Sequence, residues 1–187
     1  MLFILLSVCA AIVCFFLLVM WYDCNRFVTV DYEVESEKLT KECTFVLLSD
    51  LHNKSFGKDN EKLLREIKKL APDSILVAGD MMTAQKGDKF HVALRFMDQL
   101  AKEYPIYYGM GNHEYRAGLY SEQYGNIYEE YMSGLHSCGI EPLINETVSL
   151  PSANINICGL QMDRCYYKRF RKYPMKEDYL QKLKILF

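Results

Sequence analysis

Three apolar runs that end in polar residues decide the fold of this chain: TFVLLSDLH (residues 44–52), SILVAGD (residues 74–80) and PIYYGMGNHE (residues 105–114). Each run has the length of a buried strand, and its polar residues come directly where that strand is expected to end. The stretches between the runs show the period of helices. This alternation predicts an α/β fold in which a mixed, largely parallel sheet is flanked by helices.

Helical patterns extend this arrangement along the chain. Leu63, Ile67 and Leu70 recur on one stripe, Pro72 follows the end of that helix, and Asp88 can cap the next one. We therefore expect helices at residues 59–70, 88–101, 121–134 and 175–184, a hairpin of strands at residues 147–150 and 155–158, and a further apolar run from residue 185.

The N-terminus is a separate apolar segment. Residues 1–22 carry no charged side chain, and a helix of that length spans about 30 Å, the thickness of the hydrocarbon core of a bilayer. A cleaved signal peptide is the alternative, but no basic residue precedes the run and no small-x-small pattern lies near its end. We expect a single-pass transmembrane anchor at residues 1–22, a linker or edge strand at residues 23–42, and a domain at residues 43–187.

Charge and cysteine usage bear on localisation and partners. Basic residues follow the anchor, beginning with Arg26, and none precedes it, an asymmetry that favours a cytoplasmic domain at the cell membrane but leaves the side open. The seven cysteines show no CxxC spacing, which is typical of reduced thiols. The formal net charge of −2 excludes a broadly basic surface, so no nucleic-acid partner is expected.

The polar residues after the three runs should meet in space, because parallel strands end at the same edge of a sheet. Asp50 and His52 follow the first strand, and strand alternation aims both side chains the same way. Asp80 follows the second strand, and Asn112 and His113 follow the third. Taken singly, each cluster also fits a surface turn or a helix cap. Together, oxygen and nitrogen donors without thiolates indicate a site for manganese, iron or zinc.

These clusters carry a family resemblance. The segments SDLH (residues 49–52), AGD (residues 78–80) and GNHE (residues 111–114) resemble the first three signature blocks of the calcineurin-like metallophosphoesterases. The similarity covers roughly residues 44–187 and is greatest for the membrane-associated bacterial branch, which includes enzymes similar to UDP-diacylglucosamine pyrophosphatases. The resemblance implies a partial metallophosphoesterase sandwich and a hydrolase for phosphodiesters or pyrophosphates, with lipid-linked phosphate esters among the candidate substrates.

The resemblance also implies a role for each matched residue. Two divalent metal ions would share one carboxylate, and a hydroxide that bridges them would attack phosphorus. His113 would act at the leaving-group oxygen as general acid or charge stabiliser, and Glu114 would orient His113. The implied metal ligands are Asp50 and His52 for the first ion, Asp80 for both ions, and Asn112 for the second.

The sequence departs from the family pattern in its later blocks. The family has a further histidine after a subsequent strand and two more in a Gly-His-x-His turn, whereas this sequence contains no Gly-His. His91 and His136 match neither of these blocks, and we predict that both are surface residues. We therefore expect residues 1–187 to be the front portion of a longer domain, with little turnover alone. The alternative is a degenerate phosphoesterase domain that acts as a non-enzymatic membrane protein.

Tyrosines are concentrated between Tyr104 and Tyr131. They could line a substrate groove. Tyr124, Tyr128 and Tyr131 recur at helical spacing, however, a pattern that is more typical of side chains facing a core.

Overall fold

A computed structural model describes residues 1–87 and 90–162. Asp88, the expected helix at residues 175–184 and the apolar run from residue 185 lie outside the described residues. The chain forms two units, Met1–Glu35 and Ser36–Phe187.

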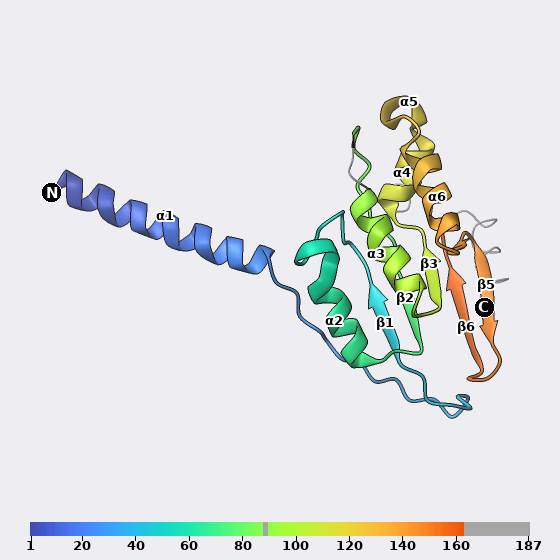
Figure 1. Ribbon diagram of the computed structural model, residues 1–187. Helices are drawn as coiled ribbons and strands as arrows, with labels where there is room; N and C mark the ends of the chain where they lie inside the picture. Colours follow the sequence, from blue (N-terminus) through green and yellow to red (C-terminus); the bar gives the residue numbers. More distant parts are fainter. Residues whose placement is uncertain (88–89, 163–187) are drawn as a thin grey trace, which may run out of the picture. The chain divides into compact units, whose positions relative to one another are not determined.

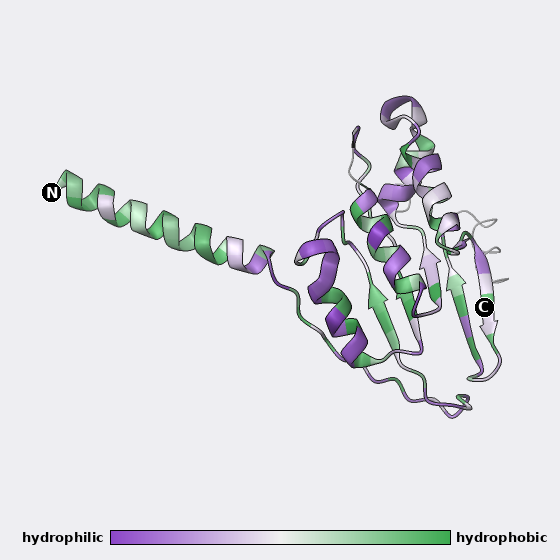
Figure 2. Cartoon of the chain, in the orientation of Figure 1, coloured by the Kyte–Doolittle hydropathy of each residue, from purple (hydrophilic) through white to green (hydrophobic). Residues whose placement is uncertain are grey.

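The first unit contains one long helix, α1 (Leu2–Cys24). It is apolar along nearly its whole length (Figure 2), and none of its residues is buried. Its 23 residues correspond to about 35 Å, so by length and composition it could cross a membrane, a test that a signal sequence also passes. Residues 25–44, all of which the structure describes, contain no helix or strand.

The second unit is built on a four-stranded parallel sheet (Figure 1), which confirms the predicted α/β class. The strands lie side by side in chain order. Val46 lies opposite Ile75, and Ile75 lies opposite Ile106. The last strand is a two-residue piece that the sequence did not predict, because its apolar run is too short to show a period. The strands are β1 (Phe45–Leu48), β2 (Ser74–Val77), β3 (Ile106–Gly109) and β4 (Pro142–Leu143).

Helices connect the parallel strands and cover the sheet. Because each crossover is expected to be right-handed and moves one strand along, the helices fall on the same face; α3 crosses in front of the strands in Figure 1. This face holds the core, in which Ile75 and Tyr108 are fully buried. The helices are η1 (Lys58–Asn60), α2 (Glu61–Leu70), α3 (His91–Ala101), α4 (Asn112–Leu119), α5 (Ser121–Tyr124) and α6 (Ile127–Ser137).

Three expected helices differ from the observed ones. The helix expected at residues 88–101 begins at His91, with Phe90 at its N-cap position. The helix predicted from residue 59 begins at Glu61, because Asp59 and Asn60 have left-handed φ angles of 49° and 62°. The single helix predicted at residues 121–134 is wrong: Gly125, with a φ of 73°, separates α5 from α6, and α4 precedes both. An isolated glycine in a helical pattern gives little warning of such a break.

The predicted hairpin is present as β5 (Glu146–Leu150) and β6 (Ile155–Gly159), paired antiparallel from Leu150 opposite Ile155. The hairpin meets the last strand of the parallel sheet at a glycine. A Cβ atom on Gly159 would lie 2.2 Å from the Cβ of Leu143, so only glycine fits there without a shift of the backbone.

Candidate metal site

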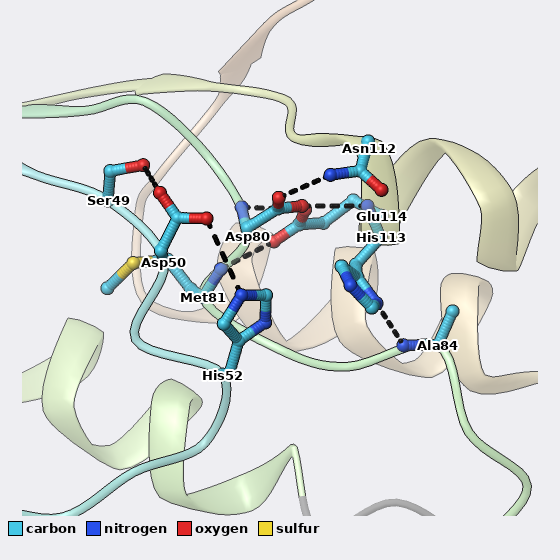
Figure 3. A network of polar contacts seen from close by, with 9 residues as sticks. All are labelled: Ser49, Asp50, His52, Asp80, Met81, Ala84, Asn112, His113 and Glu114. Carbon is cyan, nitrogen blue, oxygen red and sulfur yellow. Dashed lines mark hydrogen bonds and ion pairs between the residues drawn. The ribbon is translucent and has the colours of Figure 1, made fainter. Parts of the chain in front are cut away.

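The site lies at the carboxyl ends of β1, β2 and β3, where three loops meet (Figure 3). Parallel pairing of these strands brings their carboxyl ends to one edge of the sheet. Two of these loops and the first turn of α4, which follows the third loop, carry all six residues singled out from the sequence. Figure 3 shows them together: Asp50, His52, Asp80, Asn112, His113 and Glu114.

A turn in the first loop brings Asp50 and His52 together. We had expected the alternation of side chains along a strand to do so. β1 ends at Leu48, and both residues have left-handed φ angles, 55° and 49°. Asp and His tolerate this region better than most residues. The Nε2 atom of His52 lies 3.5 Å from Oδ1 of Asp50, and the Ser49 hydroxyl donates to the other carboxylate oxygen.

Backbone hydrogen bonds join the first loop to the second. The N–H of Asp50 donates to the carbonyl of Gly79 at 3.2 Å, and that of His52 donates to the carbonyl of Asp80 at 3.0 Å. The N–H of Asn53 donates to the carbonyl of Met81 at 2.8 Å. The position of the first loop is therefore set by the backbone of the second.

Two glycines let the second and third loops approach closely. A Cβ atom on Gly79, whose φ is 78°, would lie 2.0 Å from the backbone nitrogen of Gly111. A Cβ atom on Gly111 would lie 2.2 Å from the backbone nitrogen of Asp80. Contacts this short exclude any side chain, because real Cβ atoms do not approach other heavy atoms below about 3 Å without displacement of the backbone.

The Asp80 carboxylate lies at the centre of the site and is nearly buried, with 7% of the residue exposed. Its Oδ2 accepts a hydrogen bond from Nδ2 of Asn112 at 2.6 Å, and its Oδ1 accepts one from the backbone N–H of His113 at 2.7 Å. Both donors belong to the first turn of α4, where backbone N–H groups and the helix dipole favour negative charge.

His113 is held in one tautomer by the second loop. The N–H of Ala84 donates to Nδ1 of His113 at 2.9 Å, so a neutral ring carries its proton on Nε2. Burial lowers the pKa of His113, and the negative charge of Asp80 opposes this shift without reversing it. The ring of His52 packs edge-on against that of His113, with 4.8 Å between the ring centroids.

Glu114 has hydrogen-bond partners other than the expected one. It is fully buried, and burial raises its pKa. Its Oε2 accepts from the N–H of Asp80 at 2.9 Å, and its Oε1 accepts from the N–H of Met81 and the hydroxyl of Tyr108, each at 3.0 Å. We expected Glu114 to orient His113, but its carboxylate holds the second loop, and Ala84 orients His113.

The donor set fits a divalent cation. Candidate ligand atoms of His52, Asp80 and His113 all lie within 4.8 Å of one another. The carboxylate of Asp50 adjoins His52, and the side chain of Asn112 adjoins Asp80. Carboxylate, imidazole and amide groups without a thiolate are the ligands expected for manganese, iron or zinc at a non-sulfur site.

Several residues that shape the site were not singled out from the sequence. Gly111 and the backbone of Ala84 belong to them, as do two buried tyrosines behind Glu114, Tyr108 and Tyr131. The spacing of Tyr131 along the chain did indicate a core-facing side chain, and it is fully buried. No pattern in the sequence connects it to Glu114, because that contact depends on how α6 packs.

Comparison with known proteins agrees with this geometry. The sequence profile of the calcineurin-like phosphoesterases matches residues 43–175. A protein of Helicobacter pylori named as an uncharacterized metallophosphoesterase is 29% identical over 126 residues, which are 66% of this chain and 31% of the relative. A second one, from Campylobacter jejuni, is 28% identical over 89 residues, 46% of this chain and 24% of the relative. The matched region thus spans less than a third of either curated relative.

Proposed function

Because the chain belongs to the calcineurin-like phosphoesterase family, a class of hydrolases that act on phosphoester bonds, we propose that its site binds divalent cations for phosphoester hydrolysis. The observation that carries this proposal is the convergence of His52, Asp80 and His113, from two loops and the first turn of α4, with polar side-chain atoms within 4.8 Å of one another. His52 and Asp80 offer ligand atoms, and His113 lies beside them as a donor. Such a convergence of polar side chains is more than a shared fold, and it gives the family membership a chemical basis in this chain.

Within this proposal, Asp50 and His52 would hold one cation, Asn112 would hold a second, and Asp80 would contribute to both. A carboxylate would suit the shared position because it offers two oxygen atoms and one negative charge. When bound, the cations supply Lewis-acid activation of water and neutralise charge on the phosphoryl oxygens. Manganese, iron and zinc are the candidates, since all three accept oxygen and nitrogen ligands.

His113 is proposed as a hydrogen-bond and proton donor. Its Nδ1 accepts from the N–H of Ala84, which leaves Nε2 with the proton in the neutral ring. A protonated Nε2 has no lone pair for a metal, but it can donate to the leaving-group oxygen of a phosphoester. The hydrogen bond from Ala84 therefore favours the donor role of His113 over a ligand role.

The proposal extends to the location of the domain and to the class of its substrate. We place the domain at the cell membrane, tethered by α1 as a single-pass anchor, so that it meets phosphate esters on lipid carriers or in the cell envelope. The length and apolar composition of α1 support the anchor. Such a location suits a phosphodiesterase, or a pyrophosphatase similar to the UDP-diacylglucosamine pyrophosphatases.

The test is metal binding by the whole chain in detergent. Isothermal titration with Mn²⁺ should give a site that Asp80→Asn weakens by about a hundredfold, because one oxygen ligand and one charge are lost. Asp98→Asn, on α3 and paired with Lys102 away from the site, is the matched control and should bind as the wild type does. Any metal-dependent hydrolysis of bis(p-nitrophenyl) phosphate should fall with Asp80→Asn. Mn²⁺ binding that Asp80→Asn leaves unchanged would contradict the proposal.

A further inference from the structure

We propose that Tyr108 and Tyr131 are positioning residues of the metal site. They hold the carboxylate of Glu114, which in turn holds the backbone of Asp80. The backbone of His52 is hydrogen-bonded to that of Asp80. The consequence for metal binding rests on the proposed function; the hold on the backbone rests on the hydrogen bonds alone.

Glu114 can only accept hydrogen bonds in this arrangement. The groups that face its carboxylate are two backbone N–H groups, of Asp80 and Met81, and the hydroxyl of Tyr108. An ionised carboxylate has about four acceptor positions and no donor, so it matches three donors. Glu114 is fully buried, and its hydrogen bonds take the place of water.

The direction of the tyrosine hydrogen bonds follows from counting protons. Tyr108 has one hydroxyl proton, which it donates to Oε1 of Glu114 at 3.0 Å. The hydroxyl of Tyr131 lies 3.0 Å from that of Tyr108, so Tyr131 must be the donor of this second bond. Both tyrosines are fully buried. A chain of hydrogen bonds thus runs from α6, through the end of β3, to the first turn of α4.

The backbone at Asp80 and Met81 passes this constraint to the ligands. Its two N–H groups are bound by Glu114, and its two carbonyls accept the N–H groups of His52 and Asn53. Both faces of the same short segment are therefore fixed, one by the carboxylate and the other by the first loop. A shift of Glu114 would move Asp80 and His52 together.

There is little space to absorb such a shift. The second and third loops touch through Gly79 and Gly111, and the space that a Cβ on Gly111 would need is already taken, within 2.7 Å, by Oε2 of Glu114. Close-packed groups transmit displacements to their neighbours. Removal of partners behind a ligand commonly costs about tenfold to a hundredfold in metal affinity.

The experiment uses three variants of the whole chain in detergent: Tyr131→Phe, Tyr108→Phe and the double variant. Tyr128→Phe is the matched control, since it lies on the same helix but outside this chain of hydrogen bonds. Hydrogen–deuterium exchange is followed in peptides that cover residues 51–54 and 79–82, with a peptide from α2 as internal reference. Mn²⁺ affinity is measured by isothermal titration.

We expect Tyr131→Phe, which loses one of these hydrogen bonds, to raise exchange at residues 51–54 and 79–82 by about fivefold. Tyr108→Phe loses two of them and should raise exchange further. Exchange in α2 and in Tyr128→Phe should stay as in the wild type. Mn²⁺ affinity should fall by about tenfold in Tyr108→Phe. The double variant should match Tyr108→Phe, since Tyr131 acts only through Tyr108.

Other results overturn the inference. Unchanged exchange at residues 79–82 in both single variants would mean that the tyrosines do not hold this backbone. An equal rise in α2 would mean that they stabilise the domain as a whole. Local exchange that rises while Mn²⁺ affinity stays constant would remove their link to the metal. A wild-type chain that binds no Mn²⁺ would refute the proposed function, and the exchange data would still decide whether the tyrosines hold the loop.

Discussion

Gly79 lies at the point where the loops after β2 and β3 touch, and its side chain is excluded for two separate reasons. Its φ of 78° disfavours any residue with a Cβ, and that Cβ would lie 2.0 Å from the nitrogen of Gly111. Gly139 shares only the first reason, because its φ is 75° and no atom lies within 4 Å of a Cβ built there. A comparison of alanine substitutions at these two glycines therefore separates the cost of backbone strain from the cost of steric conflict.

We predict that Gly139→Ala lowers the free energy of unfolding by about 1 kcal/mol, the usual cost of a left-handed φ for alanine. Gly79→Ala should lower it by at least about 3 kcal/mol, since a collision with backbone is added. Urea unfolding of the detergent-solubilised chain, followed by far-UV circular dichroism, measures both values. Equal losses in the two variants would show that the loops have room to separate.

His113 allows a prediction about pH. Burial lowers its pKa, so the folded chain takes up a proton at His113 less readily than the unfolded chain does. Stability from this residue is therefore complete at neutral pH and declines as the pH falls through the unfolded value of about 6.5. A proton NMR titration of the metal-free chain should give a pKa for His113 below about 6.5, with His113→Gln as the assignment control. A value at or above 6.5 would contradict the partial burial of this ring.

At the scale of elements, the sheet has one face packed under helices and one that is much more open. Ile75, in the middle of β2, is fully buried under the helices, whereas Leu47, on the other face of β1, is 67% exposed. Neighbouring strands place these two residues one register position apart. Alanine substitutions at these two positions therefore compare the loss of a buried side chain with the loss of an exposed one.

Ile75→Ala should lower the free energy of unfolding by about 3 kcal/mol, because it removes buried methylene groups and leaves a cavity. Leu47→Ala should cost less than about 1 kcal/mol, since most of that side chain already lies in solvent. Urea midpoints of the two variants, compared with the wild type, give the difference. A large loss for Leu47→Ala would reveal that the open face is covered in solution.

Strands β1, β2 and β3 could be predicted because each is a short apolar run followed by polar residues, whereas the two-residue β4 could not. The breaks that separate α4, α5 and α6 could not, since they depend on single residues such as Gly125 that a helical pattern tolerates. The convergence of the candidate site residues could be predicted because parallel strands bring their ends together. The partners of Glu114 were missed because they include backbone N–H groups and the distant Tyr131, which come together only in the folded chain.

At the scale of the whole molecule, we predict that α1 anchors the chain in a membrane. Treatment of membranes with alkaline carbonate should leave the chain in the membrane fraction, since about 20 apolar residues are enough to span a bilayer. A variant with Leu6→Lys and Phe16→Lys should be released, because charge within the hydrocarbon is costly. Release of the wild type would contradict the anchor, and an intact mass that lacks the residues of α1 would identify a cleaved signal sequence.

Two loops and the first turn of α4, distant in sequence, are proposed to hold a divalent cation together, and the four histidines of the chain test this directly. Mn²⁺ added in small amounts broadens the NMR signals of the rings nearest to it. His52 and His113, whose ring centroids lie 4.8 Å apart, should broaden first and together, and Asp80→Asn should abolish the effect. Broadening that begins at His91 or His136, or that persists in Asp80→Asn, would contradict the claim.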